Sequence, residues 1–268
     1  MATEPPPHMS PLVLPDQALA EVIAWLTPQR LTALIDATDL KADTPGAKIR
    51  QVAEWAVEHR CCSVCVNPVE VDLLPDLLRG SGVRECYVID FPLGKSPIDL
   101  KAQQAAWVVE RSRQRRGEGP GWVELDMVIN VGRFREDTDY TRREVAAVVA
   151  AADGESVKVI IRSSELLPEE IVAACRAAVA GGARFVKNST GMESFGATPE
   201  HIRLMRETVG PDVGVKAAGG IREVLDVVRL ICAGAAPAEL RTPERFRIGT
   251  SSFAHILAGL EQLKSHST

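Results

Sequence analysis

Two lysines occupy equivalent places in two similar stretches of the sequence. Lys187 lies in residues 184–192, where a short apolar segment is followed at once by small polar residues and a glycine. Lys216 lies in residues 213–222, again at the end of an apolar segment and ahead of glycines. Lysine is rarely buried without a partner or a purpose, and glycine lets the backbone come close to a ligand. The two lysines are therefore predicted to form a pair at the ends of two successive strands.

The chemistry open to such a pair is nucleophilic attack on a carbonyl group. A lysine amine must be neutral to form a Schiff base, whereas a free lysine has a pKa of about 10.4. A second ammonium close by, in a poorly solvated pocket, lowers the pKa of an amine. Adjacent strands lie about 4.8 Å apart, so Lys216 can reach the amine of Lys187. The alternative for either lysine is a side chain that extends to solvent.

Alternating polarity along the expected strands places further charges beside the lysines. One set of alternate positions is apolar and is expected to face helices, whereas the other set is expected to face the interior of a closed sheet. Buried charges must pair, and the favoured pairs are Glu124 with Lys158 and Asp126 with Lys216. The structural alternative is a buried ion network without a catalytic role. The inward set comprises Glu124, Asp126, Lys158, Lys187, Gly214, Lys216, Arg247 and Gly249.

Eight apolar strands alternate with eight helical segments, and one more helix, residues 17–29, precedes them. This rhythm predicts an α/β fold, a TIM (β/α)8 barrel with an extra N-terminal helix. A doubly wound open sheet is the alternative, but no G-x-G-x-x-G motif follows the first strand. Residues 17–268 are expected to form a single barrel domain, and the proline-containing residues 1–16 a disordered tail. Expected strands include 34–36, 63–66, 85–90, 122–129, 157–161 and 246–249; expected helices include 46–59, 68–78, 98–116 and 138–152, with others from Pro168, Pro199, Arg222 and Ser251.

Composition limits the possible partners and compartment. The formal net charge of -5 argues against nucleic acid as the main partner. The sequence contains no run of about 18 apolar residues, so no membrane span is expected. The N-terminus does not resemble a secretory signal. The six cysteines have irregular spacing, and a Cys62-x-x-Cys65 motif without a second pair does not make a zinc site. Buried thiols, a reducing compartment and hence the cytoplasm are expected, with no metal and no cofactor.

With these residues in view, the chain resembles the deoxyribose-phosphate aldolases, a class I (Schiff-base) aldolase family that folds as a TIM barrel. The resemblance implies reversible cleavage of 2-deoxy-D-ribose 5-phosphate to acetaldehyde and D-glyceraldehyde 3-phosphate. It runs from about Leu34 to Ser252. The motifs that carry it are SVCVNP at 63–68, FPLG at 91–94, ELDMVINVG at 124–132, VKVII at 157–161, FVKNSTG at 185–191, GVKAAGGIR at 214–222 and RIGTSS at 247–252.

The resemblance also implies roles for individual residues. Lys187 corresponds to the Schiff-base lysine, Lys216 to the second active-site lysine, and Asp126 to its partner in proton transfer. The partners it implies are a phosphosugar and acetaldehyde, together with a possible homo-oligomer. The substrate-binding residues that it implies are Asp36, Leu40, Phe91, Lys158, Thr190, Gly191, Gly219, Gly220, Ser251 and Ser252.

The predicted TIM barrel also indicates where a phosphate group would bind. In TIM barrels phosphate often lies beyond strands seven and eight, against a helix N-terminus. The pairs Gly219–Gly220 and Ser251–Ser252 occupy those places, and Arg222 either assists or is a surface arginine that opens a helix. Met192 stands where some family members have a phosphate-binding lysine, and Asn188 where threonine is usual; Ala37 and Asp90 also depart from the family pattern. A related Schiff-base aldolase with another donor or acceptor, and a non-catalytic phosphosugar-binding barrel, remain the alternatives.

Overall fold

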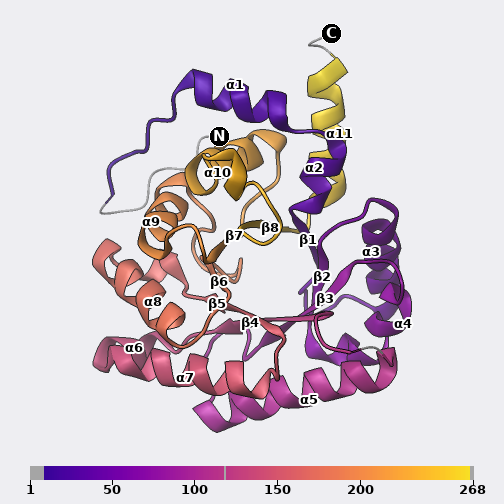
Figure 1. Cartoon of the computed structure of the whole chain (residues 1–268), viewed down its shortest axis with the longest axis vertical. Coiled ribbons are helices and arrows are strands. Elements are labelled where there is room, and N and C mark those ends of the chain that lie inside the picture. Colours follow the sequence, from indigo (N-terminus) through magenta and orange to yellow (C-terminus); the bar gives the residue numbers. More distant parts are fainter. Residues whose placement is uncertain (1–8, 118, 266–268) are drawn as a thin grey trace.

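The structure, a computed structural model, describes residues 9–117 and 119–265, and in this part of the chain eight parallel strands form a closed barrel (Figure 1). Each strand pairs with the next one in the sequence, and β8 pairs with β1. The predicted TIM barrel is confirmed, and the open doubly wound sheet is excluded. The strands are β1 (Ile35–Thr38), β2 (Ser63–Val66), β3 (Arg84–Ile89), β4 (Val123–Val128), β5 (Ser156–Ile160), β6 (Phe185–Lys187), β7 (Gly214–Ala218) and β8 (Phe246–Thr250).

Helices follow every strand and surround the barrel (Figure 1). Two more helices precede β1; the first packs against α10 and the second against α11. The α-helices are α1 (Asp16–Trp25), α2 (Pro28–Ala33), α3 (Gly46–Glu58), α4 (Leu74–Leu78), α5 (Ile98–Arg116), α6 (Val131–Glu136), α7 (Thr138–Ala151), α8 (Pro168–Ala180), α9 (Pro199–Val209), α10 (Val224–Gly234) and α11 (Phe253–Ser265). Short 3-10 helices are η1 (Pro68–Asp72), η2 (Ser163–Glu165) and η3 (Ala238–Leu240).

The single helix predicted for residues 17–29 is two helices in the structure. α1 ends at Trp25, and α2 begins at Pro28, where the Thr27 side chain accepts a hydrogen bond from the Arg30 amide at 3.2 Å. Proline has no amide hydrogen and suits the first position of a helix, so Pro28 starts a new helix instead of continuing the old one.

Other element boundaries also differ from the predictions. The helix expected over residues 68–78 is divided into η1 and α4, and α6 was not predicted. The helices after β7 and β8 begin at Val224 and Phe253, not at Arg222 and Ser251. The Asp226 carboxylate accepts from the amides of Arg222 and Glu223 at 3.0 Å, which holds this segment as a turn ahead of α10. These turns lie at the carboxyl ends of the strands, beside the pocket described below.

The N-terminal segment is described from residue 9 onward, so residues 1–8 of the predicted tail lie outside the described part of the chain. The amide of Leu12 donates to Glu200 Oε1 at 2.8 Å, and the side chain of Leu12 packs against the core. The boundary between tail and barrel at residue 16 stays a prediction.

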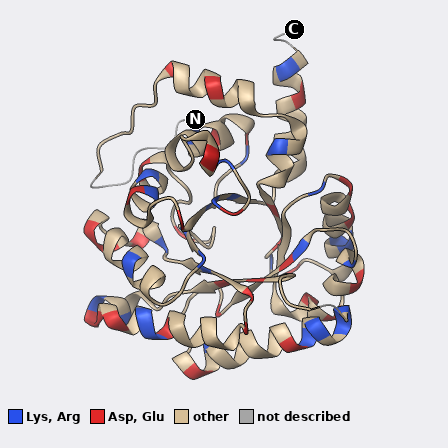
Figure 2. Ribbon diagram, viewed as in Figure 1, with Lys and Arg blue, Asp and Glu red and all other residues tan. Residues whose placement is uncertain are grey.

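The strand alternation predicted from the sequence is confirmed. Val123, Leu125 and Met127 of β4 lie in the apolar core between barrel and helices, whereas the intervening Glu124 and Asp126 form ion pairs inside the barrel. Figure 2 shows both positive and negative residues on the ring of strands. On β6 the aromatic ring of Phe185 shares the interior with Lys187, and it leaves no room at Gly214, where an added Cβ would lie 2.1 Å from the Phe185 ring.

All six cysteines are free and buried, as predicted. Among residues 9–117 and 119–265, we find no helix with the length and apolar character needed to cross a membrane.

Candidate active site

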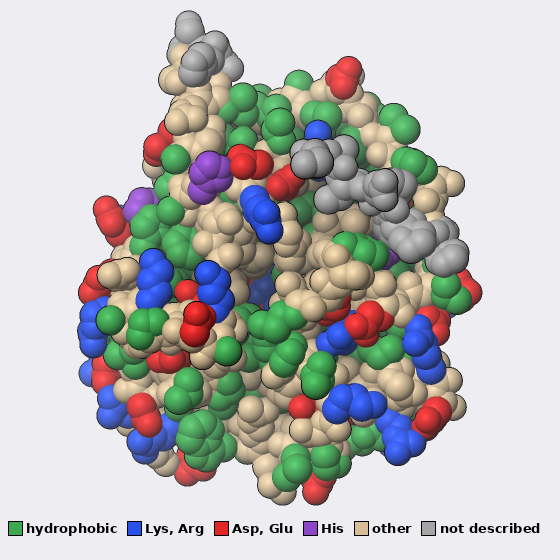
Figure 3. Space-filling model, turned by 180° about the vertical axis from the view of Figure 1, so that it is seen from behind, with side chains coloured by type: hydrophobic (Ala, Val, Ile, Leu, Met, Phe, Trp, Pro, Cys, Tyr) green, Lys and Arg blue, Asp and Glu red, His purple; other side chains and the backbone are tan. Residues whose placement is uncertain are grey.

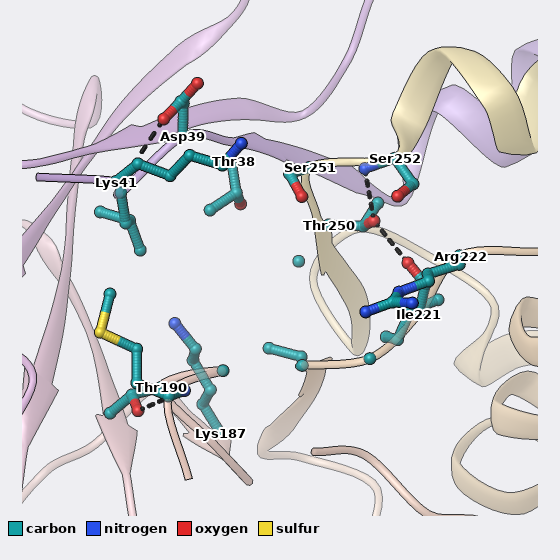
Figure 4. A pocket seen from close by; sticks show the side chains of 17 residues that line it. Thr38, Asp39, Lys41, Lys187, Thr190, Ile221, Arg222, Thr250, Ser251 and Ser252 are labelled. Atoms are coloured by element: carbon teal, nitrogen blue, oxygen red, sulfur yellow. Dashed lines mark hydrogen bonds between the residues drawn. The ribbon is translucent and has the colours of Figure 1, made fainter. Parts of the chain in front are cut away.

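A pocket of about 250 Å³ opens at the carboxyl ends of the strands. It lies between the loops that follow β1, β6, β7 and β8, and the face seen in Figure 3 is hollowed at its centre. This is the end of a parallel barrel where active sites are built. The residues that line it are Thr38, Asp39, Leu40, Lys41, Lys187, Thr190, Gly191, Met192, Ala218, Gly219, Gly220, Ile221, Arg222, Gly249, Thr250, Ser251 and Ser252 (Figure 4).

Lys187 is the basic residue that reaches the pocket from within the barrel. It ends β6, its side chain is 2% exposed, and its Nζ donates to Asp126 Oδ2 at 2.7 Å. Figure 4 shows the amine pointing into the cavity. A buried amine at the inner end of a pocket is placed to meet a carbonyl group of a bound molecule.

Lys216 lies beside Lys187, because the two residues are register partners on β7 and β6. Its Nζ donates to the same Asp126 Oδ2 at 2.8 Å and also lies 2.6 Å from Asp36 Oδ2. Burial alone would lower the pKa of Lys216, but the carboxylates of Asp126 and Asp36 hold it well above its usual value. Lys216 is therefore a fixed positive charge next to the amine of Lys187.

Asp126 is the acceptor at the centre of the site. Its Oδ1 accepts from Lys158 Nζ at 3.0 Å and from Cys86 Sγ at 3.1 Å, so both oxygens are occupied. Burial would raise the pKa of Asp126, but Lys158, Lys187 and Lys216 together hold it well below its usual value. Asp126 is therefore a carboxylate at neutral pH.

A deeper layer of charges continues the network below Asp126. Lys158 lies 2.7 Å from Glu124 Oε2, and Arg247 donates to Asp36 at 2.7 Å and to Glu124 at 3.0 Å. The predicted pairs of Glu124 with Lys158 and of Asp126 with Lys216 are both confirmed. Burial opposes the charge on Asp36, yet Lys216 and Arg247 hold its pKa below the usual value.

The structure divides the sequence-predicted binding residues into two groups. Asp36 and Lys158 lie beneath the pocket within the ion network, and Phe91 packs beside Cys65, Cys86 and Val88. These residues do not line the cavity. The others do: Leu40, Thr190, Gly191, Gly219, Gly220, Ser251 and Ser252.

Backbone amides at the pocket differ in whether they are free. The amides of Thr190 and Gly191 both donate to the carboxylate of Glu193, which also accepts from Ser189 Oγ at 2.5 Å. Ser252 donates its amide to Thr250 Oγ1 at 2.9 Å. In contrast, the amides of Gly220 and Ser251 have no acceptor among the described residues. These two amides are the ones left for an anionic ligand.

Two features of the site were not predicted from the sequence. Glu193, three residues after Thr190, accepts the hydrogen bonds that hold the turn after Lys187. No residue pattern in the sequence indicated this role. Lys41 lines the pocket from the loop after β1, directly after the predicted Leu40. Its place in the sequence, next to Leu40, did not show which way its side chain would point.

Two groups of acidic and thiol side chains come close enough together to ligate a metal, namely Cys65, Cys86 and Asp126, and Asp36, Cys86 and Glu124. Lys158 Nζ contacts members of both groups, lying 3.2 Å from Cys86 Sγ and 2.7 Å from Glu124. The Lys158 ammonium therefore lies against both groups and supplies a positive charge to their carboxylates.

A closed parallel barrel with a buried lysine amine at the inner end of its pocket, a second lysine and a carboxylate beside it, has the arrangement of a Schiff-base aldolase. Residues 31–252 match the family model described as DeoC/LacD family aldolase, and the chain belongs to that family.

Individual relatives agree with this assignment. The chain is 43% identical over 233 residues to a deoxyribose-phosphate aldolase of Clostridium perfringens, covering 86% of this chain and 96% of the relative. It is also 43% identical to the enzyme of that name from Geobacillus, over 85% of this chain and 95% of the relative. Among solved structures, the tetrameric deoxyribose-phosphate aldolase of Aeropyrum pernix matches with a TM-score of 0.78 and 29% identity, over 92% of this chain and 97% of that one.

Proposed function

We propose that this protein is a class I deoxyribose-phosphate aldolase that reversibly cleaves 2-deoxy-D-ribose 5-phosphate to acetaldehyde and D-glyceraldehyde 3-phosphate. The observation that carries the proposal is the amine of Lys187 at the inner end of the pocket, held 2.7 Å from a carboxylate that also binds Lys216. The relatives from Clostridium perfringens and Geobacillus, both deoxyribose-phosphate aldolases, support the same substrate.

In the proposed mechanism Lys187 is the nucleophile. Its neutral amine adds to the aldehyde carbon of the open-chain sugar, and loss of water gives an iminium ion. Loss of a proton from the hydroxyl on the third carbon then breaks the bond between the second and third carbons. The bonding electrons move into the iminium to give an enamine, and glyceraldehyde 3-phosphate leaves. Protonation of the enamine carbon and hydrolysis release acetaldehyde and regenerate Lys187.

Asp126 and Lys216 are proposed to carry out the proton transfers of this reaction. Asp126 accepts a hydrogen bond from Lys187, so it is placed to take a proton from that amine. Lys216 donates to the same oxygen and is placed to return a proton through Asp126 or an ordered water. Its positive charge also lies next to the amine that must lose a proton before it can attack the aldehyde.

The phosphate is proposed to lie at the β7 and β8 side of the pocket. The amides of Gly220 and Ser251 are free to donate there, and Arg222 lines the same wall. Figure 4 shows the Arg222 guanidinium directed into the cavity. Among the predicted contacts, Thr190 and Gly191 have amides already bound to Glu193, so we assign them to the wall of the sugar site.

A coupled assay for glyceraldehyde 3-phosphate tests the function. Product formed from 2-deoxy-D-ribose 5-phosphate supports it. A related aldolase with another donor or acceptor could still form an imine at Lys187 but would release no glyceraldehyde 3-phosphate from this sugar. A non-catalytic phosphosugar-binding barrel would do neither.

We also propose a homo-oligomer in the cytoplasm that works without a cofactor and without nucleic acid as a partner. The tetrameric assembly of the Aeropyrum pernix enzyme supports the first point. Six free, buried cysteines are typical of a reducing compartment. Size-exclusion chromatography with multi-angle light scattering at micromolar concentration measures the oligomeric state.

A further inference from the structure

Lys41 is a cation at the pocket that the proposed mechanism leaves unused. It follows Leu40 in the loop between β1 and α3, and its side chain is exposed. Figure 4 shows this side chain extending over the cavity toward Thr38, on the opposite side from Arg222. We propose that Lys41 determines specificity for phosphorylated sugars by binding the substrate phosphate from the β1 side. This inference rests on the proposed function and names a contact within it.

The loop that carries Lys41 is held in place by its own hydrogen bonds. The amide of Asp39 donates to the Cys65 carbonyl at 3.0 Å, which ties the loop to the end of β2. The Asp39 carboxylate accepts from Thr44 Oγ1 at 2.7 Å and from the Lys41 amide at 3.3 Å. Asp39 thus stabilises the turn, as aspartate does in many turns. A turn fixed in this way directs the Lys41 side chain to the mouth of the pocket.

The Lys41 ammonium has no carboxylate within ion-pair distance among the residues that the structure describes. Asp39 lines the same pocket, but its contacts are to the loop and not to the ammonium. An unpaired ammonium on a fixed loop over a cavity is available to an anion that enters there.

The wall of the pocket on the β6 side has few free hydrogen-bond donors for a phosphate. The amides of Thr190 and Gly191 are bound by the Glu193 carboxylate, whose charge would repel an anion. Burial would raise the pKa of Glu193, but hydrogen bonds from Ser189 and Thr190 keep it lowered, so that carboxylate stays charged. Met192, on the same loop, is apolar and 53% exposed. The phosphate is therefore expected to be bound between the β7–β8 wall and the β1 loop.

The charge of the phosphate also indicates a role for Lys41. A phosphate ester carries a charge of about -1.5 to -2 near pH 7. Among the described residues that line the pocket, the basic side chains are those of Lys41, Lys187 and Arg222, and Lys187 is hydrogen-bonded to Asp126. Arg222 supplies one positive charge to the phosphate, and Lys41 supplies the second. If Lys41 binds the phosphate and not the reacting carbons, its contribution should appear in substrate binding and not in the chemical step.

The test compares Lys41→Met, Lys41→Arg and a control, Lys48→Met, which removes an exposed lysine on α3 whose ammonium hydrogen-bonds Gln51 at 3.4 Å. Lys41→Met should raise KM for 2-deoxy-D-ribose 5-phosphate, and the inhibition constant of inorganic phosphate, by about tenfold to a hundredfold, as for loss of one charge-assisted hydrogen bond. Values of kcat, and KM for unphosphorylated 2-deoxyribose, should change less than about twofold. Lys41→Arg should recover most of the phosphate affinity, and Lys48→Met should match the wild type.

The outcomes separate this inference from the function on which it rests. An active wild type with an unchanged KM and phosphate inhibition constant in Lys41→Met overturns the role of Lys41 alone. Equal losses on phosphorylated and unphosphorylated sugars also overturn it, since the residue would then serve the fold or the sugar. A wild type that forms no glyceraldehyde 3-phosphate contradicts the proposed function and, with it, this inference.

Discussion

Lys187 and Lys216 donate to one and the same oxygen of Asp126, at 2.7 and 2.8 Å. The two lysines are register partners on adjacent strands, so the barrel itself fixes this convergence. Lys216 has a second carboxylate, Asp36, at 2.6 Å. Lys216 therefore pairs with two carboxylates, whereas Lys187 pairs with Asp126, and the proposed mechanism gives the two amines different roles.

Removing the charge of Lys216 tests this division of roles. In Lys216→Leu, Asp126 would interact with Lys187 without competition, and the protonated form of the nucleophile would be favoured. Activity at pH 7 should fall by about a hundredfold or more, because proton transfer is also lost, and should recover in part above pH 9. The measurement is the pH profile of imine trapping with acetaldehyde. A profile with the wild-type midpoint would show that the Lys216 charge does not control the nucleophile.

The phosphate site is tested at Gly220. This residue has φ +74° and a free amide at the pocket, so Gly220→Val both strains the turn and blocks the anion. KM for the phosphorylated sugar should rise about tenfold or more, and KM for unphosphorylated deoxyribose much less. Gly80→Val is the matched control, because Gly80 has φ +72°, equally open space and a place away from the pocket. Equal losses on both sugars would place the phosphate elsewhere.

Arg247 is expected to stabilise the fold through the lower ion network. It is almost fully buried and bridges Asp36 and Glu124. Arg247→Met leaves those carboxylates without this partner, and the free energy of unfolding should fall by about 3–5 kcal/mol. Arg133→Met, which breaks the exposed ion pair with Glu136, should leave the free energy of unfolding nearly unchanged. Urea denaturation measures both, and equal stability of the two variants would contradict the importance of the buried network.

Acid should weaken the wild-type fold in a defined direction. The pKa values of Asp36, Glu124 and Asp126 are lowered in the folded state, where cations outweigh the effect of burial. A carboxylate whose pKa is lowered by folding stabilises the protein at pH values above its unfolded pKa, which is about 3.9 for aspartate and 4.3 for glutamate. This stabilisation is lost as the pH falls from the unfolded pKa toward the lower folded-state pKa. Urea denaturation between pH 7 and pH 3 should show the loss, with a shallower dependence in Arg247→Met. A wild-type stability independent of pH in this range would contradict it.

The sequence predicted the interior of the barrel better than its mouth, for physical reasons. Inside, strand alternation leaves each side chain only two directions, so Glu124 and Lys158 on neighbouring strands had to meet. At the mouth, the partner of each amide depends on loop conformation. Neither the binding of Thr190 and Gly191 by Glu193 nor the position of Lys41 follows from residue spacing. Likewise, the break of the first helix at Pro28 was missed because the apolar spacing continues through it.

The identity of the nucleophile is the prediction on which the others depend. Lys187 should form an imine with acetaldehyde, and borohydride should reduce it to a stable ethyl amine. The physical reason is that Lys187 is a buried lysine that also lines the pocket, with Asp126 placed to accept its proton. Peptide mass mapping after brief treatment should place the adduct on the peptide that contains Lys187.

Variants and internal controls make that experiment decisive. Lys187→Arg should abolish the adduct, because a guanidinium stays protonated and cannot add to an aldehyde. Lys101 is an internal control, since it is equally buried but lies 2.6 Å from Glu144 and does not line the pocket. It should remain unlabelled, and exposed lysines such as Lys48 should react slowly, since a solvated lysine side chain ordinarily has a pKa of about 10.4. Label spread evenly over the exposed lysines, or surviving in Lys187→Arg, would mean that another group carries the chemistry.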